Sequence, residues 1–135
     1  ETPSGLSAAQ MDLLRARLVQ SPDRKLSVAD MAESLGLSES WFAHVFKRST
    51  GTTPVQWQLG ERIDLARGLL LESDLRLSEI AAQLGFSDQA HLTRVFRQNC
   101  GLPPAAWRRI RREQAQRADV AETAQGRSIA ARQQF

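Results

Sequence analysis

The sequence contains a single cysteine, Cys100, among 135 residues, so no disulfide can form within the chain. A chain so poor in cysteine is typical of a reducing compartment. No apolar run approaches the roughly 18 residues that a membrane-spanning helix needs, and no signal peptide opens the sequence. We therefore expect a cytoplasmic protein with no membrane partner.

The sequence also lacks the patterns of an enzyme or a metal site. Its two histidines, His44 and His91, lie in different segments, and no spacing typical of metal ligands appears. A catalytic site needs a nucleophile, a base and an orienting group that converge, and no such set is evident. We expect no catalytic activity, no metal and no cofactor.

Neither sign of charge dominates, because 18 Lys and Arg residues stand against 15 Asp and Glu residues. Net charge alone is therefore a poor indicator of a nucleic-acid partner. The positive charge is unevenly distributed, and the segment 108–112 carries a cluster of arginines. This cluster has two interpretations, a solvated helix face or a surface that contacts phosphates.

What the sequence does contain is a repeat. The segment 29–46, ADMAESLGLSESWFAHVF, recurs as the segment 78–96, SEIAAQLGFSDQAHLTRVF. Matching positions are 49 residues apart as far as Ser38 and Ser87 and 50 residues apart from Val45 and Val95 onward, so the second copy holds one additional residue. A repeat of this length is one supersecondary unit used twice.

Each copy predicts two short helices joined by a tight turn. Apolar residues recur at helical spacing before Gly36 and before Gly85, where a left-handed residue would end the first helix. Ser38, matched by Ser87, is the expected cap of the second helix. The inward stripes of the two second helices are Phe42, Val45 and Phe46, and Leu92, Val95 and Phe96. Two such units in register, each followed by a Gly…Pro…Trp segment, indicate the helix-turn-helix, which presents its second helix to the DNA major groove.

Helix start signals divide the rest of the chain. Ser7 with Gln10, and Ser27 with Asp30, form capping boxes. Thr53 followed by a proline begins a helix of about 18 residues that joins the two copies. The expected organisation is a linker at 1–6, a first helix-turn-helix subdomain at 7–53, a linker helix at 54–72, a second helix-turn-helix subdomain at 73–117, and a tail or helix extension at 118–135.

Residues 26–107 resemble the DNA-binding domain of the AraC/XylS family of bacterial transcription regulators. The segments that carry the resemblance are VFKRSTGTTPVQW, ERIDLARGLL and LSEIAAQLGFSDQAHLTRVFRQNCGLPPAAW. The resemblance implies an all-α fold of about seven helices, with two helix-turn-helix subdomains joined by a long linker helix. The sequence departs from the family's pattern at Arg76, where a Ser or Thr cap is usual, and at Pro103, where the first copy has Thr53.

The resemblance also implies function and partners. It implies sequence-specific binding of double-stranded DNA in successive major grooves, activation of transcription through contact with RNA polymerase, and association with the bacterial nucleoid. Members usually carry a separate sensor or dimerisation domain, commonly N-terminal, so we expect this chain to be the DNA-binding part of a longer protein. The alternative is a helical protein-interaction adaptor that keeps the fold without specific DNA binding. Such an adaptor would show acidic or apolar outward faces, whereas the faces here are polar to basic.

Outward residues of the second helix in each copy are the candidate DNA contacts. In the first copy, Ser40, Ala43 and His44 match positions from which related regulators contact bases. Serine and histidine can hydrogen-bond to bases, and an alanine methyl group can contact thymine. Trp41 has two open interpretations, packing beside Val45 or lying against the sugar–phosphate backbone.

In the second copy the candidates are Gln89, His91, Thr93, Arg94 and Arg97. Arg94 can bind guanine O6 and N7 together or grip a phosphate, and Gln89 suits adenine. Asp88 is expected to act instead as a favourable charge at the helix N-terminus. Lys47, Arg97 and the arginines of 108–112 would contact phosphates, which sets affinity rather than sequence preference.

Overall fold

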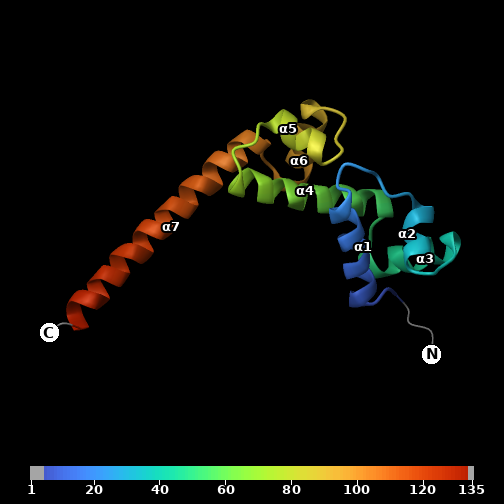
Figure 1. Cartoon of the computed structure of the whole chain (residues 1–135), viewed down its shortest axis with the longest axis horizontal. Coiled ribbons are helices and arrows are strands. Elements are labelled where there is room, and N and C mark those ends of the chain that lie inside the picture. The colour runs from blue at the N-terminus through green and yellow to red at the C-terminus, as the bar shows by residue number, and fades with distance from the viewer. Residues whose placement is uncertain (1–4, 134–135) are drawn as a thin grey trace.

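Seven helices and no strand make up the part of the chain that the computed structural model describes, residues 5–133. They are α1 (Ala8–Gln20), α2 (Val28–Ser34), α3 (Glu39–Thr50), α4 (Pro54–Glu72), α5 (Leu77–Gln83), α6 (Gln89–Cys100) and α7 (Pro104–Gln133). Figure 1 shows α4 along the middle of the molecule, with α1 to α3 at one end, α5 and α6 at the other, and α7 projecting away. The predicted all-α architecture, two helix-turn-helix subdomains on a long helix, is confirmed.

Each helix-turn-helix bends at a glycine with positive φ, +68° at Gly36 and +78° at Gly85. The residue after each glycine donates its N–H back into the preceding helix, Leu37 to the Ala32 carbonyl and Phe86 to the Ala81 carbonyl, both at 2.9 Å. This is the Schellman arrangement, which requires a left-handed residue and satisfies a free carbonyl at the helix end. The prediction that these glycines end α2 and α5 is confirmed.

Four of the predicted helix starts are confirmed. Ser7 and Ser27 form reciprocal capping boxes, and Ser38 and Thr53 cap α3 and α4. The hydrogen bonds from the Ser27 backbone N–H and hydroxyl hold the pKa of the Asp30 carboxyl below its ordinary value. The departure noted before α5 is also visible, because its N-cap residue, Arg76, makes no capping bond through its side chain.

The predicted cap at Ser87 is wrong. Asp88 is the N-cap of α6, and its Oδ1 accepts a hydrogen bond from the His91 N–H at 2.7 Å. The role expected for Asp88 at the helix N-terminus is therefore confirmed. The additional residue of the second copy lies before the helix and moves the cap one position along the chain.

Helix α4 contributes to two hydrophobic cores. Near its start, Trp57 packs into the first core with Leu14, Leu18, Met31, Ala32, Phe42 and Phe46. Further along, Ile63, Ala66 and Leu70 pack into the second core with Ile80, Ala81, Leu84, Phe86, Leu92, Val95, Phe96 and Trp107. Leu65 packs against both cores, so one helix holds the two subdomains together.

The helix that follows each helix-turn-helix also binds backbone groups of the segment that leads into that motif. In the first subdomain Gln58 of α4, only 4% exposed, bonds to both the N–H and the carbonyl of Leu26, at 2.9 and 2.7 Å. Arg62, 3% exposed, donates to the carbonyls of Pro22 and Arg24, at 3.1 and 2.6 Å. Burial lowers the pKa of the Arg62 guanidinium, an effect that Asp23 opposes, but arginine stays protonated in proteins.

The second subdomain repeats this arrangement 50 residues later. Arg108 stands where the first copy has Gln58, and Arg112 stands where it has Arg62.

Both arginines bind the end of α4. Arg108 donates to the carbonyls of Leu70 and Ser73, at 2.9 and 3.1 Å. Arg112 donates to the same two carbonyls, at 3.0 and 2.6 Å, and pairs with Asp74 at 3.1 Å. They thus satisfy carbonyls that a helix C-terminus leaves without partners. Burial lowers the pKa of Arg108, as does neighbouring Arg112, while Asp74 opposes the effect.

These contacts correct the expectation that the arginines of 108–112 contact phosphates. Two of the four arginines hold the protein together, and Arg111 lies over the Trp107 ring at 5.6 Å. Only Arg109 is exposed with no such contact among the described residues.

Helix α7 has 30 residues, a length of about 45 Å. The segment from 118 to 133, for which the sequence left two possibilities, continues this helix, and residues 134–135 lie outside the described part. Val120 on the projecting portion is 69% exposed. No helix in the described part is both long enough and apolar enough to cross a membrane.

We expect Asp88→Ala to lower the free energy of unfolding by about 1 kcal/mol, the usual cost of losing an N-cap side chain. Ser87→Ala is the matched control and should change stability by less than about 0.5 kcal/mol, as for other surface substitutions. Urea unfolding followed by circular dichroism measures both. Equal losses would contradict the assignment of the cap.

We expect Arg112→Gln to lower the free energy of unfolding by roughly 1–2 kcal/mol, because charge-assisted bonds to two carbonyls are lost while Arg108 still serves both. Arg109→Gln, the control on the same helix, should leave stability unchanged. Arg112→Gln should not alter the salt dependence of DNA binding, because its guanidinium is bound to carbonyls of the protein. A drop in that dependence for Arg112→Gln would restore a phosphate-contacting role.

Candidate nucleic-acid interface

Helix α3 divides into a buried and an exposed face, as its sequence predicts. Phe42, Val45 and Phe46 are buried in the first subdomain. The candidates Ser40, Ala43, His44 and Lys47 are all exposed on the remaining surface of the helix. The last turn carries Lys47 and Arg48, so this end of the exposed face is positively charged.

Trp41 does not pack into the core beside Val45, the first of the two interpretations its position allowed. Its side chain is 42% exposed. Its ring lies 5.6 Å from the His44 ring, with the planes tilted by 33°. The two rings together form an exposed aromatic platform one helical turn long.

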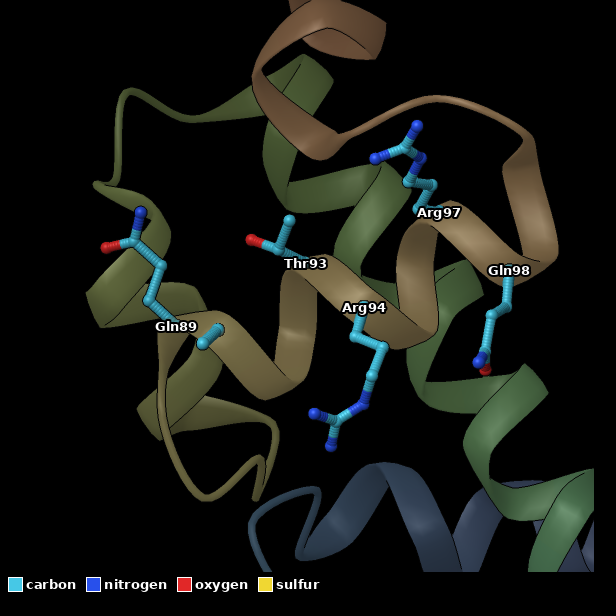
Figure 2. Close-up of a pocket in the computed structure, with 6 residues that line it drawn as sticks. Gln89, Thr93, Arg94, Arg97 and Gln98 are labelled. Carbon is cyan, nitrogen blue, oxygen red and sulfur yellow. The ribbon is translucent and has the colours of Figure 1, made fainter.

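Helix α6 has the same division, with Leu92, Val95 and Phe96 buried. Its outer face forms a shallow hollow of about 870 Å³ lined by Gln89, Ala90, Thr93, Arg94, Arg97 and Gln98. Figure 2 shows these side chains spread along the helix, with the guanidinium groups of Arg94 and Arg97 directed to opposite sides. The structure thus brings four of the five candidates of the second copy together on one surface.

Sequence reasoning missed two residues of this surface, Ala90 and Gln98. Gln98 lies four residues after Arg94, a spacing that places both on one helix face. The helical period could therefore have identified it. Its amide can both donate and accept a hydrogen bond.

The polar side chains of both outer faces are available to an external ligand. In the described part of the chain, the side-chain hydrogen bonds made from within α3 and α6 involve residues that are not among the candidates on these faces, namely Ser49, Thr50, His91, Asn99 and Cys100. No such bond with another described residue is made by the side chains of Ser40, Lys47, Gln89, Arg94 and Arg97. An exposed polar group without a protein partner is solvated by water, so it carries no free-energy penalty and can hydrogen-bond to a ligand.

His91 is not part of the outer face. It is partly buried, and its Nδ1 accepts a hydrogen bond from the Ser87 N–H at 3.2 Å. Its ring meets the Phe86 ring edge-on at 5.3 Å. It also lines a small cavity with Lys25 and Arg62, between the two subdomains. His91 therefore has partners within the protein, and its contact with DNA stays a prediction.

Among the described residues, no group of three or more His, Cys, Asp or Glu side chains could hold a metal ion. The sulfur of Cys100 accepts a hydrogen bond from Arg67 at 3.1 Å, on the side of α6 that packs on α4.

Comparison with known proteins agrees with this geometry. The family model described as a helix-turn-helix domain matches residues 31–110. The HTH-type transcriptional regulator YidL of Escherichia coli K12 is 38% identical over 97 residues, which cover 72% of this chain and 33% of that protein. The chain thus spans about a third of the length of this curated relative.

This chain matches nearly the whole length of two solved structures. The DNA-binding domain of AdpA, in complex with a target DNA, has a TM-score of 0.68 at 29% identity and covers 80% of this chain and 96% of that chain. A Chromobacterium violaceum regulator of the group with AraC-type DNA-binding domains has a TM-score of 0.64 at 27% identity and covers 74% of this chain and 91% of that chain. The match of fold, repeat and sequence shows that the chain belongs to the AraC/XylS family of transcription regulators, a family of double-stranded-DNA-binding proteins rather than of enzymes.

Proposed function

We propose that this chain binds an asymmetric operator of about two helical turns as a monomer, with α3 and α6 in successive major grooves. The observation that carries the proposal is the pair of exposed, polar-to-basic faces of α3 and α6, which have no partner among the described residues, on two subdomains that share one continuous helix, α4. Two identical recognition helices related by two-fold symmetry would require a palindromic site. Here one chain supplies two different recognition helices, so the site it prefers is asymmetric.

Base contacts are assigned to the N-terminal half of each outer face. Arg94 takes guanine through O6 and N7, and Gln89 takes adenine through N6 and N7, pairings that bidentate geometry favours. In the first half-site Ser40 and His44 hydrogen-bond to base edges, and the Ala43 methyl group contacts thymine. Thr93 and Gln98 border the surface around Arg94 and extend the second half-site.

Phosphate contacts are assigned to the edges of the same faces. Lys47 and Arg97 lie in the last turns of α3 and α6 and neutralise phosphates there. Trp41, exposed beside His44, lies against the sugar–phosphate backbone. Such contacts set register and affinity, whereas the base contacts set sequence preference.

The complete regulator extends beyond this domain. The domain spans about a third of the related YidL protein, which supports a further sensor or dimerisation domain in the same polypeptide. The family resemblance supports activation through contact with RNA polymerase. The helical adaptor remains the competing function, but the basic outward faces of α3 and α6 favour DNA.

Selection from a duplex library with about 30 random base pairs tests the proposal, since two turns of DNA occupy about 21 base pairs. We expect enrichment of two different half-site motifs in one orientation. A palindromic motif would contradict monomeric binding. No enrichment, together with binding that changes little between low and high salt, would favour the adaptor.

We expect Arg94→Ala to weaken binding of the selected duplex by roughly 1–3 kcal/mol and to relax the preference at one base pair, because a bidentate base contact is lost. Lys47→Ala should weaken selected and random duplexes about equally and reduce the slope of log K against log salt by about one. Salt titrations on both duplexes measure these effects. If the two variants behaved alike, the division into base and phosphate contacts would be wrong.

We expect the complex to contain bent DNA. Helix α4 has 19 residues and is about 28 Å long, whereas successive major grooves on one face of straight DNA are about 34 Å apart. Bending toward the protein shortens this distance and costs of order 1–6 kcal/mol, which the contacts of the second recognition helix can offset. A circular-permutation gel shift measures the bend. An unbent complex with both half-sites protected in a footprint is the contrary result.

A further inference from the structure

The two subdomains touch each other directly, in addition to sharing α4. The loop between α1 and α2 belongs to the first subdomain, and the turn of the second helix-turn-helix lies on it. A Cβ atom added to Gly85 would come within 2.6 Å of the Asp23 carbonyl oxygen and 2.9 Å of its carbonyl carbon. Gly36, at the same place in the first copy, has no such neighbour within 4 Å. The second turn therefore makes a backbone-to-backbone contact that the first lacks.

The loop under Gly85 is held rigidly at the point of contact. The buried Arg62 guanidinium binds the carbonyls on both sides of Asp23, those of Pro22 and Arg24. Gln58 fixes the end of the loop through the backbone of Leu26. Because Gln58 and Arg62 both come from α4, the loop cannot shift without breaking bonds to the helix that joins the subdomains.

The first turn of α6 lies at the same boundary between the two subdomains. His91 is fixed there by the Ser87 N–H and by the Phe86 ring, and it faces a cavity of about 120 Å³ that Lys25 and Arg62 also line. The N-terminal turn of the second recognition helix thus faces the first subdomain across this cavity.

We infer that the contact between Gly85 and the Asp23 loop fixes the orientation of α6 relative to α3, and so sets the number of base pairs between the two half-sites. Gly85 and Arg62 are positioning residues for DNA recognition, and neither contacts DNA. The inference rests on the proposed two-groove binding.

The physical reason is the distance of this contact from the axis of α4. Each subdomain packs on a different part of α4, so rotation about the axis of α4 is opposed mainly by side-chain packing, and a contact away from that axis resists it. Adding one base pair between the half-sites moves the second by about 3.4 Å and turns it by about 34°. A pair of recognition helices with a fixed mutual orientation cannot follow such a change, and therefore rejects the altered spacing.

A matched pair of variants tests the inference. Asparagine is the non-glycine residue that best accepts positive φ, so Gly85→Asn and Gly36→Asn introduce similar backbone strain. Only Gly85→Asn must also displace Asp23. Selection from the library of about 30 random base pairs, followed by sequencing, gives the distribution of distances between the two motifs.

Wild type and Gly36→Asn should return one spacing, and Gly85→Asn should return several. On duplexes whose spacing is one base pair too long, the affinity penalty of Gly85→Asn should be smaller than that of wild type by about fivefold, the size of a modest coupling between contacting groups. Arg62→Lys keeps the charge but cannot bind both carbonyls as a guanidinium does, so it should broaden the spacing as well.

A measurement on the free protein separates loss of orientation from loss of folding. Spin labels at Ala43→Cys and Ala90→Cys, in a Cys100→Ser background, report the distance between the exposed faces of α3 and α6. The distance distribution should be narrow in wild type and Gly36→Asn and broad in Gly85→Asn and Arg62→Lys, with helix content unchanged.

The possible failures are distinguishable. If the wild-type chain enriches no sequence, the proposed function is wrong. If it enriches one motif only, DNA binding stands and the inference fails. If Gly85→Asn and Arg62→Lys keep a single spacing and a narrow label distance, the contact does not set orientation and the inference is overturned. Should Gly85→Asn not fold, the spacing and label distances of Arg62→Lys decide alone.

Discussion

Backbone carbonyls that precede each helix-turn-helix must find donors, and in both copies the donors are side chains of the helix that follows. Arg62 serves the loop before α2, and its counterpart Arg112 serves the end of α4 before α5. A buried carbonyl without a partner costs about as much as a lost hydrogen bond, so these donors decide where the chain can enter each motif. A guanidinium suits the task because its planar fork reaches two carbonyls at once. The position of each recognition helix depends on these bonds.

The repeat explains why one helix has two roles. As the last helix of the first copy, α4 supplies Trp57 to the first core and Arg62 to the preceding loop. As the support of the second copy, it supplies Ile63 and Leu70 to the second core. Helix α7 repeats only the first of these roles, with Trp107 packed edge-on against Phe96 just as Trp57 packs against Phe46. Beyond Arg112, residues 113–124 of α7 are all exposed, and the C-terminal part of this helix projects from the body (Figure 1).

Arginine has opposite uses in this small domain. Arg62, Arg108 and Arg112 bind carbonyls inside the protein, whereas Arg94 and Arg97 extend from α6 with no internal partner in the described structure. The formal net charge of +3 counts all of them alike, which is why it says little about the ligand. In the proposed complex, the charge that a phosphate backbone meets is the local charge of two helix faces. The proposal therefore rests on the arrangement of the arginines and not on composition.

The amino-acid sequence was enough to predict the helices, the glycine turns and the buried stripes of α3 and α6. These features depend on contacts within a few residues, such as helical period, capping and the positive φ that Gly36 and Gly85 accept. A local ambiguity misplaced one cap, because Ser87 and Asp88 can both bond to the first turn of α6.

Which outward side chains lack a partner among the described residues became clear from the tertiary packing alone. His91 lies at the boundary between the subdomains, and Trp41 is exposed. Arg108 and Arg112 donate hydrogen bonds to carbonyls at the end of α4. The same packing also placed Gly85 on the backbone of Asp23, 62 positions earlier in the chain. Such contacts join segments that are distant in sequence, so no local pattern encodes them, and they depend on how two packed units meet across a shared helix.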